Sequence, residues 1–116
     1  MPKRSDYRQM VYICSAFSGD ELANTQKTKR YCRYALDHNC MPVAPHLMYP
    51  QFMDEDDREQ RELGMFFALV LLDKCDELWV FGKPSEGMSR EIAKAKKRGI
   101  PIKYYNHKCE VLEYGT

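Results

Sequence analysis

The chain has 116 residues, 44% of them hydrophobic and 30% charged, with a formal net charge of +1. This length suits one core, so we expect a single domain over residues 1–116, with residues 1–9 as a flexible or peripheral segment. A net charge near zero predicts no specific binding to nucleic acid. No apolar segment is long enough to span a bilayer and no signal region follows Met1, so we expect a cytoplasmic protein that does not bind membranes.

The cysteines indicate reduced thiols. There are five of them, an odd number, and no two have the C-x-x-C spacing of a zinc site. The three histidines show no metal-binding spacing either. We therefore expect neither a metal nor a cofactor.

The first half of the chain reads as strand, helix and strand. A run of apolar and β-favouring residues predicts a strand over Met10–Ala16, and an amphipathic helix with one basic face follows over about Glu21–His38. Met41–Pro45 is a strand candidate weakened by two prolines. His46–Met53 reads as an irregular loop.

The next helix is expected over about Asp56–Asp73, with the acidic residues 54–57 at its start. Its second half, residues 63–72, is apolar nearly all round. A helix of this kind needs cover on more than one side, which one sheet face in so small a chain cannot provide. We therefore expect a homodimer or higher homo-oligomer formed through residues 63–72.

The second half of the chain continues the alternation. We expect a strand over Glu77–Phe81, a helix over Met88–Arg98 that ends at Gly99, and a strand over Ile102–Tyr105. Val111 and Leu112 could add a short fifth strand. Together the elements predict an α/β fold of flavodoxin or Rossmann type: a doubly wound, mostly parallel sheet of four or five strands with helices on both faces.

Function is expected in the loops at the carboxyl edge of this sheet. The loop over residues 15–20 lacks the G-x-G-x-x-G fingerprint and the P-loop pattern. Its serines and the following helix N-terminus could still hold a phosphate or a ribose hydroxyl. The alternative is an ordinary tight turn in which Ser18 or Asp20 caps the helix.

Two further residues each have two interpretations. Glu91 falls in the first turn of a helix that begins near Met88, where a carboxylate stabilises the helix by up to about 1 kcal/mol and could pair with Lys94. It could equally reach the loop mouth and react there. His46 could donate a proton or grip a ligand oxygen, or it could be a loop histidine bonded to backbone.

Three segments together resemble the nucleoside 2-deoxyribosyltransferase-like superfamily, which includes the deoxynucleoside 5′-monophosphate N-glycosidases, and in particular its small uncharacterised bacterial and phage members. They are Val11–Ser15, Cys75–Phe81 and Pro84–Glu91, the last followed by Gly99–Pro101. The resemblance spans about Val11 to Ile102.

The resemblance implies a role for several residues. Glu91 matches the glutamate nucleophile of the enzymes, Tyr12 matches a tyrosine that orients it, and Ser85 matches a contact to the sugar or phosphate. The ligand would be a small nucleoside or nucleotide. The residues expected to bind it are Ser15, Ala16, Phe17, Ser18, Gly19, His46, Ser85, Gly87 and Met88.

Two positions depart from the enzymes' pattern. An aspartate on the helix before the third strand, which assists the leaving base, is replaced here by Ala68, and a basic residue of the first loop is replaced by Ser18. Three functions are therefore weighed: N-glycosidase or deoxyribosyltransferase activity through Glu91, binding or sensing of a nucleotide-derived ligand without cleavage, and a structural role in assembly with a vestigial pocket.

Overall fold

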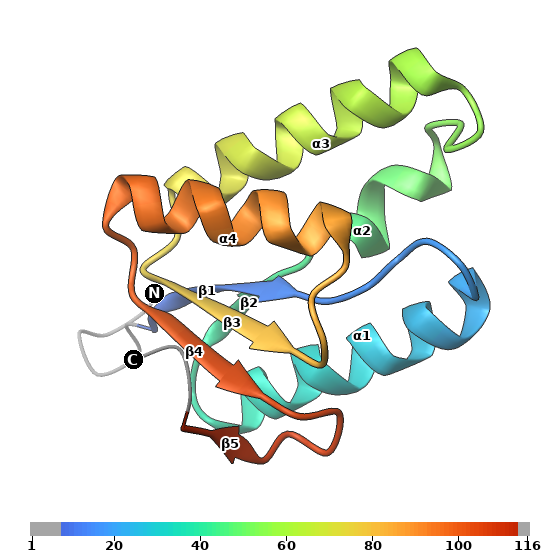
Figure 1. Cartoon of the computed structure of the whole chain (residues 1–116). Coiled ribbons are helices and arrows are strands. Elements are labelled where there is room, and N and C mark those ends of the chain that lie inside the picture. The colour runs from blue at the N-terminus through green and yellow to red at the C-terminus, as the bar shows by residue number, and fades with distance from the viewer. Residues whose placement is uncertain (1–7, 114–116) are drawn as a thin grey trace, which may run out of the picture.

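The computed structural model describes residues 8–113, which fold into one sheet flanked by helices (Figure 1). The expected N-terminal segment lies mostly outside the described residues. The strands are β1 (Met10–Cys14), β2 (Met41–Val43), β3 (Glu77–Phe81), β4 (Ile102–Tyr105) and β5 (Val111–Leu112). The helices are α1 (Glu21–Asp37), α2 (Pro45–Met48), the 3₁₀ helix η2 (Tyr49–Gln51), α3 (Arg58–Asp73) and α4 (Glu86–Arg98).

The sheet has the strand order β2-β1-β3-β4-β5. The first four strands are parallel, and β5 pairs with β4 in the antiparallel sense. This confirms the α/β fold class, and the sheet formed by residues 8–113 has five strands. The chain leaves β1 towards β2 and then crosses to β3 on the other side of β1, so the switch point, where ligands bind in such sheets, lies between β1 and β3.

The helices cover both faces of the sheet, as expected. Alternate residues of β1 belong to two separate cores, since the side chains of a strand point to opposite faces. Tyr12 and Cys14 pack with α3 and α4, whereas Val11 and Ile13 pack with α1. Figure 1 shows the same layers, with α3 and α4 together on one side and α1 on the other.

Several element boundaries differ from those expected. β1 ends at Cys14 and β2 at Val43, two residues earlier than expected in each case, and α3 begins at Arg58 because the Asp57 side chain accepts a hydrogen bond from the Glu59 N–H at 3.0 Å. The expected irregular loop after β2 contains the short helix α2, which begins at Pro45. Proline suits the first helical position because its missing N–H is not needed there.

Helix α4 begins two residues earlier than expected. The Ser85 hydroxyl accepts a hydrogen bond from the Met88 N–H at 3.3 Å and thereby caps the helix, so Glu86 is its first residue. Glu91 therefore lies in the second turn, and its expected position in the first turn is wrong. The expected partner Lys94 instead forms an ion pair with Asp73 of α3, at 3.5 Å.

Helix α3 buries one narrow face and leaves apolar side chains exposed. Gly64, Ala68 and Leu72 are buried. On the outer side, Phe66 is 59% exposed and lies between two further exposed apolar residues, Leu63 and Val70. We call Leu63, Phe66 and Val70 the outer α3 stripe. Within residues 8–113, no helix combines the length and the apolar character that a bilayer crossing requires.

Candidate functional site

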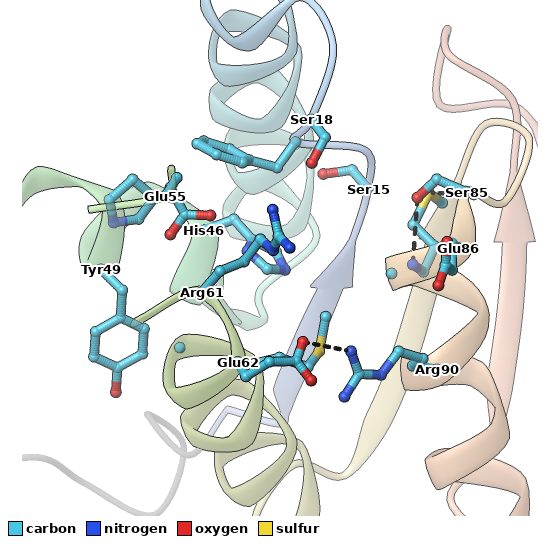
Figure 2. A pocket seen from close by; sticks show the side chains of 16 residues that line it. Ser15, Ser18, His46, Tyr49, Glu55, Arg61, Glu62, Ser85, Glu86 and Arg90 are labelled. Atoms are coloured by element: carbon cyan, nitrogen blue, oxygen red, sulfur yellow. Dashed lines mark hydrogen bonds and ion pairs between the residues drawn. The ribbon is translucent and has the colours of Figure 1, made fainter. Parts of the chain in front are cut away.

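A pocket of about 450 Å³ opens at the carboxyl edge of the sheet, on the α3 and α4 side (Figure 2). It is built from the loop after β1, from α2 and η2, from the first two turns of α3, and from the start of α4. Its lining residues are Ser15, Phe17, Ser18, His46, Tyr49, Pro50, Glu55, Arg61, Glu62, Gly64, Met65, Ser85, Glu86, Gly87, Met88 and Arg90.

Glu91 lies fully buried next to this pocket and does not line it. Its Oε2 atom accepts two hydrogen bonds, one from the Tyr12 hydroxyl of β1 and one from Nε2 of His46, the latter at 3.1 Å. Its Oε1 atom is buried and has no hydrogen-bond partner. One carboxylate oxygen is thus held by two donors while the other accepts no hydrogen bond, which is unusual for a buried polar atom, although the Cys14 thiol lies near enough for burial and the charge of Glu91 to raise its pKa.

Burial and the charge of Glu91 together shift the pKa values of its two neighbours. Burial raises the pKa of Tyr12 well above its usual value, and the negative charge of Glu91 raises it further, so Tyr12 remains a protonated donor. Burial lowers the pKa of His46, but the hydrogen bond and the charge of Glu91, together with the charge of Glu55, outweigh this effect and raise it. The site therefore favours the protonated form of His46 relative to a free imidazole, because its pKa is raised.

His46 is the group that links the buried carboxylate to the pocket. Its position on α2 follows from Pro45, whose ring is buried at the first position of that helix. The Phe17 ring stacks on the imidazole, with a centroid distance of 6.0 Å and an interplanar angle of 21°. The His46 side chain is 23% exposed, so one edge reaches the pocket while Nε2 points to Glu91.

The Ser15 hydroxyl is a hydrogen-bond acceptor towards the pocket. The Thr28 hydroxyl donates to the Asn24 carbonyl at 2.9 Å, so its only hydrogen is used. The 2.7 Å hydrogen bond between Ser15 and Thr28 must then be donated by Ser15. With its own hydrogen committed to Thr28, Ser15 offers lone pairs, which suit a ligand hydroxyl better than a phosphate oxygen.

Two arginines that the sequence analysis did not select line the pocket. Arg90 forms an ion pair with Glu62 at 3.2 Å, whereas Arg61 takes part in no ion pair within residues 8–113. Figure 2 shows Arg61 extending from α3 towards His46. In the sequence, Arg61 lies just before the apolar part of α3 and Arg90 lies directly before Glu91, and no local pattern marks either as a pocket residue.

The structure brings most of the expected site residues together. The pocket is lined by Ser15, Phe17, Ser18, His46, Ser85, Gly87 and Met88, and Tyr12 and Glu91 lie beside it. Two are not part of its lining: Ala16 faces a different cavity, and Gly19 sits in an exposed turn with φ of +97°. The Ser85 hydroxyl is engaged in capping α4.

Ala68 is fully buried in the core that also contains Leu72 and Leu78. An alanine therefore stands where the enzymes of the resemblance have an aspartate, and the acidic side chains that line the pocket, those of Glu55, Glu62 and Glu86, come from other positions. Among the described residues, no three His, Cys, Asp or Glu side chains are grouped so that they could hold a metal ion.

Comparison with solved structures identifies a similar fold. A 2-deoxyribosyltransferase from the psychrotolerant bacterium Bacillus psychrosaccharolyticus superimposes with a TM-score of 0.63 over 90% of this chain and 77% of its own. The two sequences are 17% identical. At this identity the likeness shows a shared fold. The relationship between this chain and that enzyme is a distant, structural one.

Comparison of the sequence with family models identifies its family. A family model described as a domain of unknown function, DUF7768, matches residues 9–105. No curated protein matches the sequence. The matched range contains every lining residue of the pocket as well as Tyr12 and Glu91.

Proposed function

From the premise that the chain belongs to the DUF7768 family, and from the geometry around Glu91, we propose that it binds a nucleoside or nucleoside 5′-monophosphate and cleaves the glycosidic bond. Glu91 is the nucleophile in this proposal. The reaction is an N-glycosidase reaction if water accepts the sugar, and a deoxyribosyl transfer if a second base does.

The arrangement of the Glu91 carboxylate carries the proposal. A nucleophilic carboxylate needs one oxygen fixed and the other free to attack. Tyr12 and His46 hold Oε2, and Oε1 has no partner. A buried acceptor without a hydrogen-bond partner lowers stability. The presence of such an atom next to a pocket therefore favours a catalytic role for Glu91 over a role in stabilising the helix.

The chemistry follows from these positions. Glu91 Oε1 forms a bond to the anomeric carbon, the bond from that carbon to the base nitrogen breaks, and the base leaves with the electron pair. His46, which contacts the carboxylate and also lines the pocket, supplies the proton for the base. Water or a second base then attacks the anomeric carbon and releases the carboxylate. Because Glu91 is fully buried, α2 or its own side chain must shift before the sugar can reach it.

The fold likeness to the 2-deoxyribosyltransferase supports this proposal. The pocket lies at the switch point between β1 and β3, the usual ligand position in such sheets. Its size of about 450 Å³ suits a nucleoside. Ser15, as an acceptor, matches a sugar hydroxyl, and Arg61 provides a cation for a 5′-phosphate.

The test is incubation of the protein with deoxynucleosides and their 5′-monophosphates, with the released base separated by chromatography. Free base is expected for at least one substrate, and a second added base distinguishes transfer from hydrolysis. Glu91→Gln should reduce base release at least about a hundredfold, because an amide is a poor nucleophile. A glycosylated Glu91 peptide, detected by mass spectrometry, would identify the attacking residue directly.

Glu59→Gln provides the matched control. Glu59 is an exposed glutamate of α3 that lines neither cavity at the sheet edge and does not contact Tyr12 or His46. This variant should retain most of the activity. Base release that survives Glu91→Gln unchanged would contradict the assignment of the nucleophile.

The second candidate function is binding of the same ligand class without cleavage. The buried Ala68 favours it, since no carboxylic acid stands at that position to protonate a leaving base, and so does the complete burial of Glu91. Thermal stabilisation by a nucleoside or nucleotide without release of base would select this function. If the pocket neither binds nor cleaves these ligands, the assembly role remains, with the outer α3 stripe as the contact surface.

A further inference from the structure

A second cavity lies at the carboxyl edge of the sheet, on the opposite side from the pocket beside Glu91. Its volume is about 370 Å³. It is formed by α1, by the residues that follow β3, and by the connection between β4 and β5. Figure 1 shows α1 and this connection on the same side of the sheet. The lining residues are Ser15, Ala16, Asn24, Lys27, Tyr31, Phe81, Gly82, Lys83 and His107.

Every charged group that lines this cavity is basic. Lys27 comes from α1, Lys83 follows β3, and His107, which adds a charge when protonated, comes from the β4–β5 connection. No aspartate or glutamate lines it. The whole chain carries a net charge of only +1, so this concentration of one sign is local. A cleft lined by one sign of charge raises the local concentration of the opposite ion.

The two lysines are not used by the fold. Five other basic side chains form ion pairs with carboxylates on the described surface, namely Arg33, Arg90, Lys94, Arg98 and Lys103. Neither Lys27 nor Lys83 forms one anywhere in residues 8–113. Both ammonium groups are therefore available to a ligand.

The wall behind these cations is aromatic and rigid. Tyr31 and Phe81 are almost fully buried and stack with a centroid distance of 4.3 Å and an interplanar angle of 9°. Arg30 adds positive charge nearby: burial raises the pKa of Tyr31, and the charge of Arg30 partly offsets that rise. Asn24 fixes the loop above the cavity by donating to the carbonyls of Phe17 and Ser18 at 3.1 and 3.0 Å.

We propose that this cavity is a binding site for the phosphate group of a small molecule, held between Lys27 and Lys83. Two lysines from separate chain segments, Lys27 of α1 and Lys83 after β3, line the same cavity, and a compact dianion such as phosphate can pair with both. The site is separate from the Glu91 carboxylate and does not depend on any reaction there.

The proposal is tested by titrating the full chain with inorganic phosphate and with ribose 5-phosphate, each at constant ionic strength set by sodium chloride. Backbone amide shifts in NMR spectra report where the ligand binds. Saturable shifts at residues 81–83 and on α1 are expected for at least one of the two. Similar affinity for both indicates a site for free phosphate, and tighter binding of ribose 5-phosphate indicates a phosphate ester.

Variants connect the binding to the two lysines. Lys27→Gln and Lys83→Gln should each weaken phosphate binding by about threefold to tenfold, and the double variant should abolish it. Lys97→Gln is the matched control, because Lys97 is an exposed lysine of α4 that lines neither cavity. Absence of saturable binding, or an equal loss in Lys97→Gln, would overturn the proposal.

Discussion

Tyr12 is the residue on which the position of the Glu91 carboxylate depends most directly. Both side chains are fully buried, and the Tyr12 hydroxyl donates to the same oxygen that His46 contacts. The pair joins β1 to α4 through the core between them. When a buried acceptor loses its donor, no hydrogen bond offsets the free-energy cost of removing that acceptor from water.

Replacement of Tyr12 by phenylalanine should therefore lower the free energy of unfolding by about 2 kcal/mol. Urea denaturation followed by circular dichroism gives this value. Tyr31→Phe is the control, since the Tyr31 ring is also buried but its hydroxyl forms no hydrogen bond recorded in residues 8–113. If both variants lowered the free energy of unfolding equally, the hydrogen bond between Tyr12 and Glu91 would make no specific contribution to stability.

His46 should make stability depend on pH. Its pKa is raised above 6.5 in the folded protein, so the fold favours its protonated form. The resulting stabilisation is fully present below pH 6.5 and is lost as the pH rises through the folded pKa. The difference in unfolding free energy between the wild type and His46→Gln should be larger near about pH 6 than near about pH 9.

The measurement combines urea denaturation at several pH values with an NMR titration of the His46 ring. The titration should give a pKa above 6.5, and Glu91→Gln should lower it, because the charge of Glu91 is one of the causes of the shift. A difference that grows with increasing pH would contradict the assignment of charges at this site.

At the scale of single elements, α4 depends on its first residues. The Ser85 cap sets the start of the helix at Glu86, and this start determines which way Met88 and Glu91 face. Ser85→Ala should cost about 1 kcal/mol of stability. Ser89→Ala, an exposed position in the first two turns of the same helix, should cost less than half as much. Thermal denaturation of the two variants provides the comparison, and equal losses would argue against the cap.

The order and type of the longer elements could be predicted from the sequence, because each shows a clear apolar period or run. α2 could not, since its four residues are too few to show a helical period and Pro45 and Pro50 suggest a loop. The sequence predicts a start of α4 at Met88, whereas the cap at Ser85 starts the helix at Glu86 and includes Gly87 in its first turn despite the weak helix propensity of glycine.

The site was only partly predictable from the sequence, because some of its contacts depend on elements that no local pattern reveals. Ser15, Ser85 and Glu91 lie in or next to loops whose place at the sheet edge follows from the order of the strands. The contact of Glu91 with His46 depends on the path of α2, which no local pattern encodes. Arg61 lies one turn inside α3, and only the angle of that helix brings it to the pocket.

At the scale of the whole molecule, the outer α3 stripe remains the basis for expecting a homo-oligomer. Leu63, Phe66 and Val70 lie on one side of the helix and are all exposed. Such a row of apolar side chains is costly to leave in water and is typical of a contact surface. Phe66, the most exposed of the three, would lie near the centre of the contact.

The mass of the protein in solution, measured by light scattering after size exclusion, should exceed that of the 13.7 kDa chain. Phe66→Ser should raise the dissociation constant of the oligomer at least about tenfold, since central aromatic residues dominate such contacts. Leu22→Ser is the control, because Leu22 is 75% exposed but lies on α1. A wild-type protein with the mass of one chain would refute the expectation.

Ser15 belongs to the lining of both cavities at the sheet edge. The Ser15 hydroxyl has one hydrogen, which it donates to Thr28. If a ligand in one cavity accepted this hydrogen instead, the hydroxyl would present different hydrogen-bonding groups to a ligand in the other cavity. Occupancy of the two cavities would then be thermodynamically linked, and such a linkage is reciprocal: a ligand in one cavity would change affinity in the other by the same factor as the second ligand changes affinity for the first. The Ser15 side chain, which lines both cavities, would carry this coupling between the two sites.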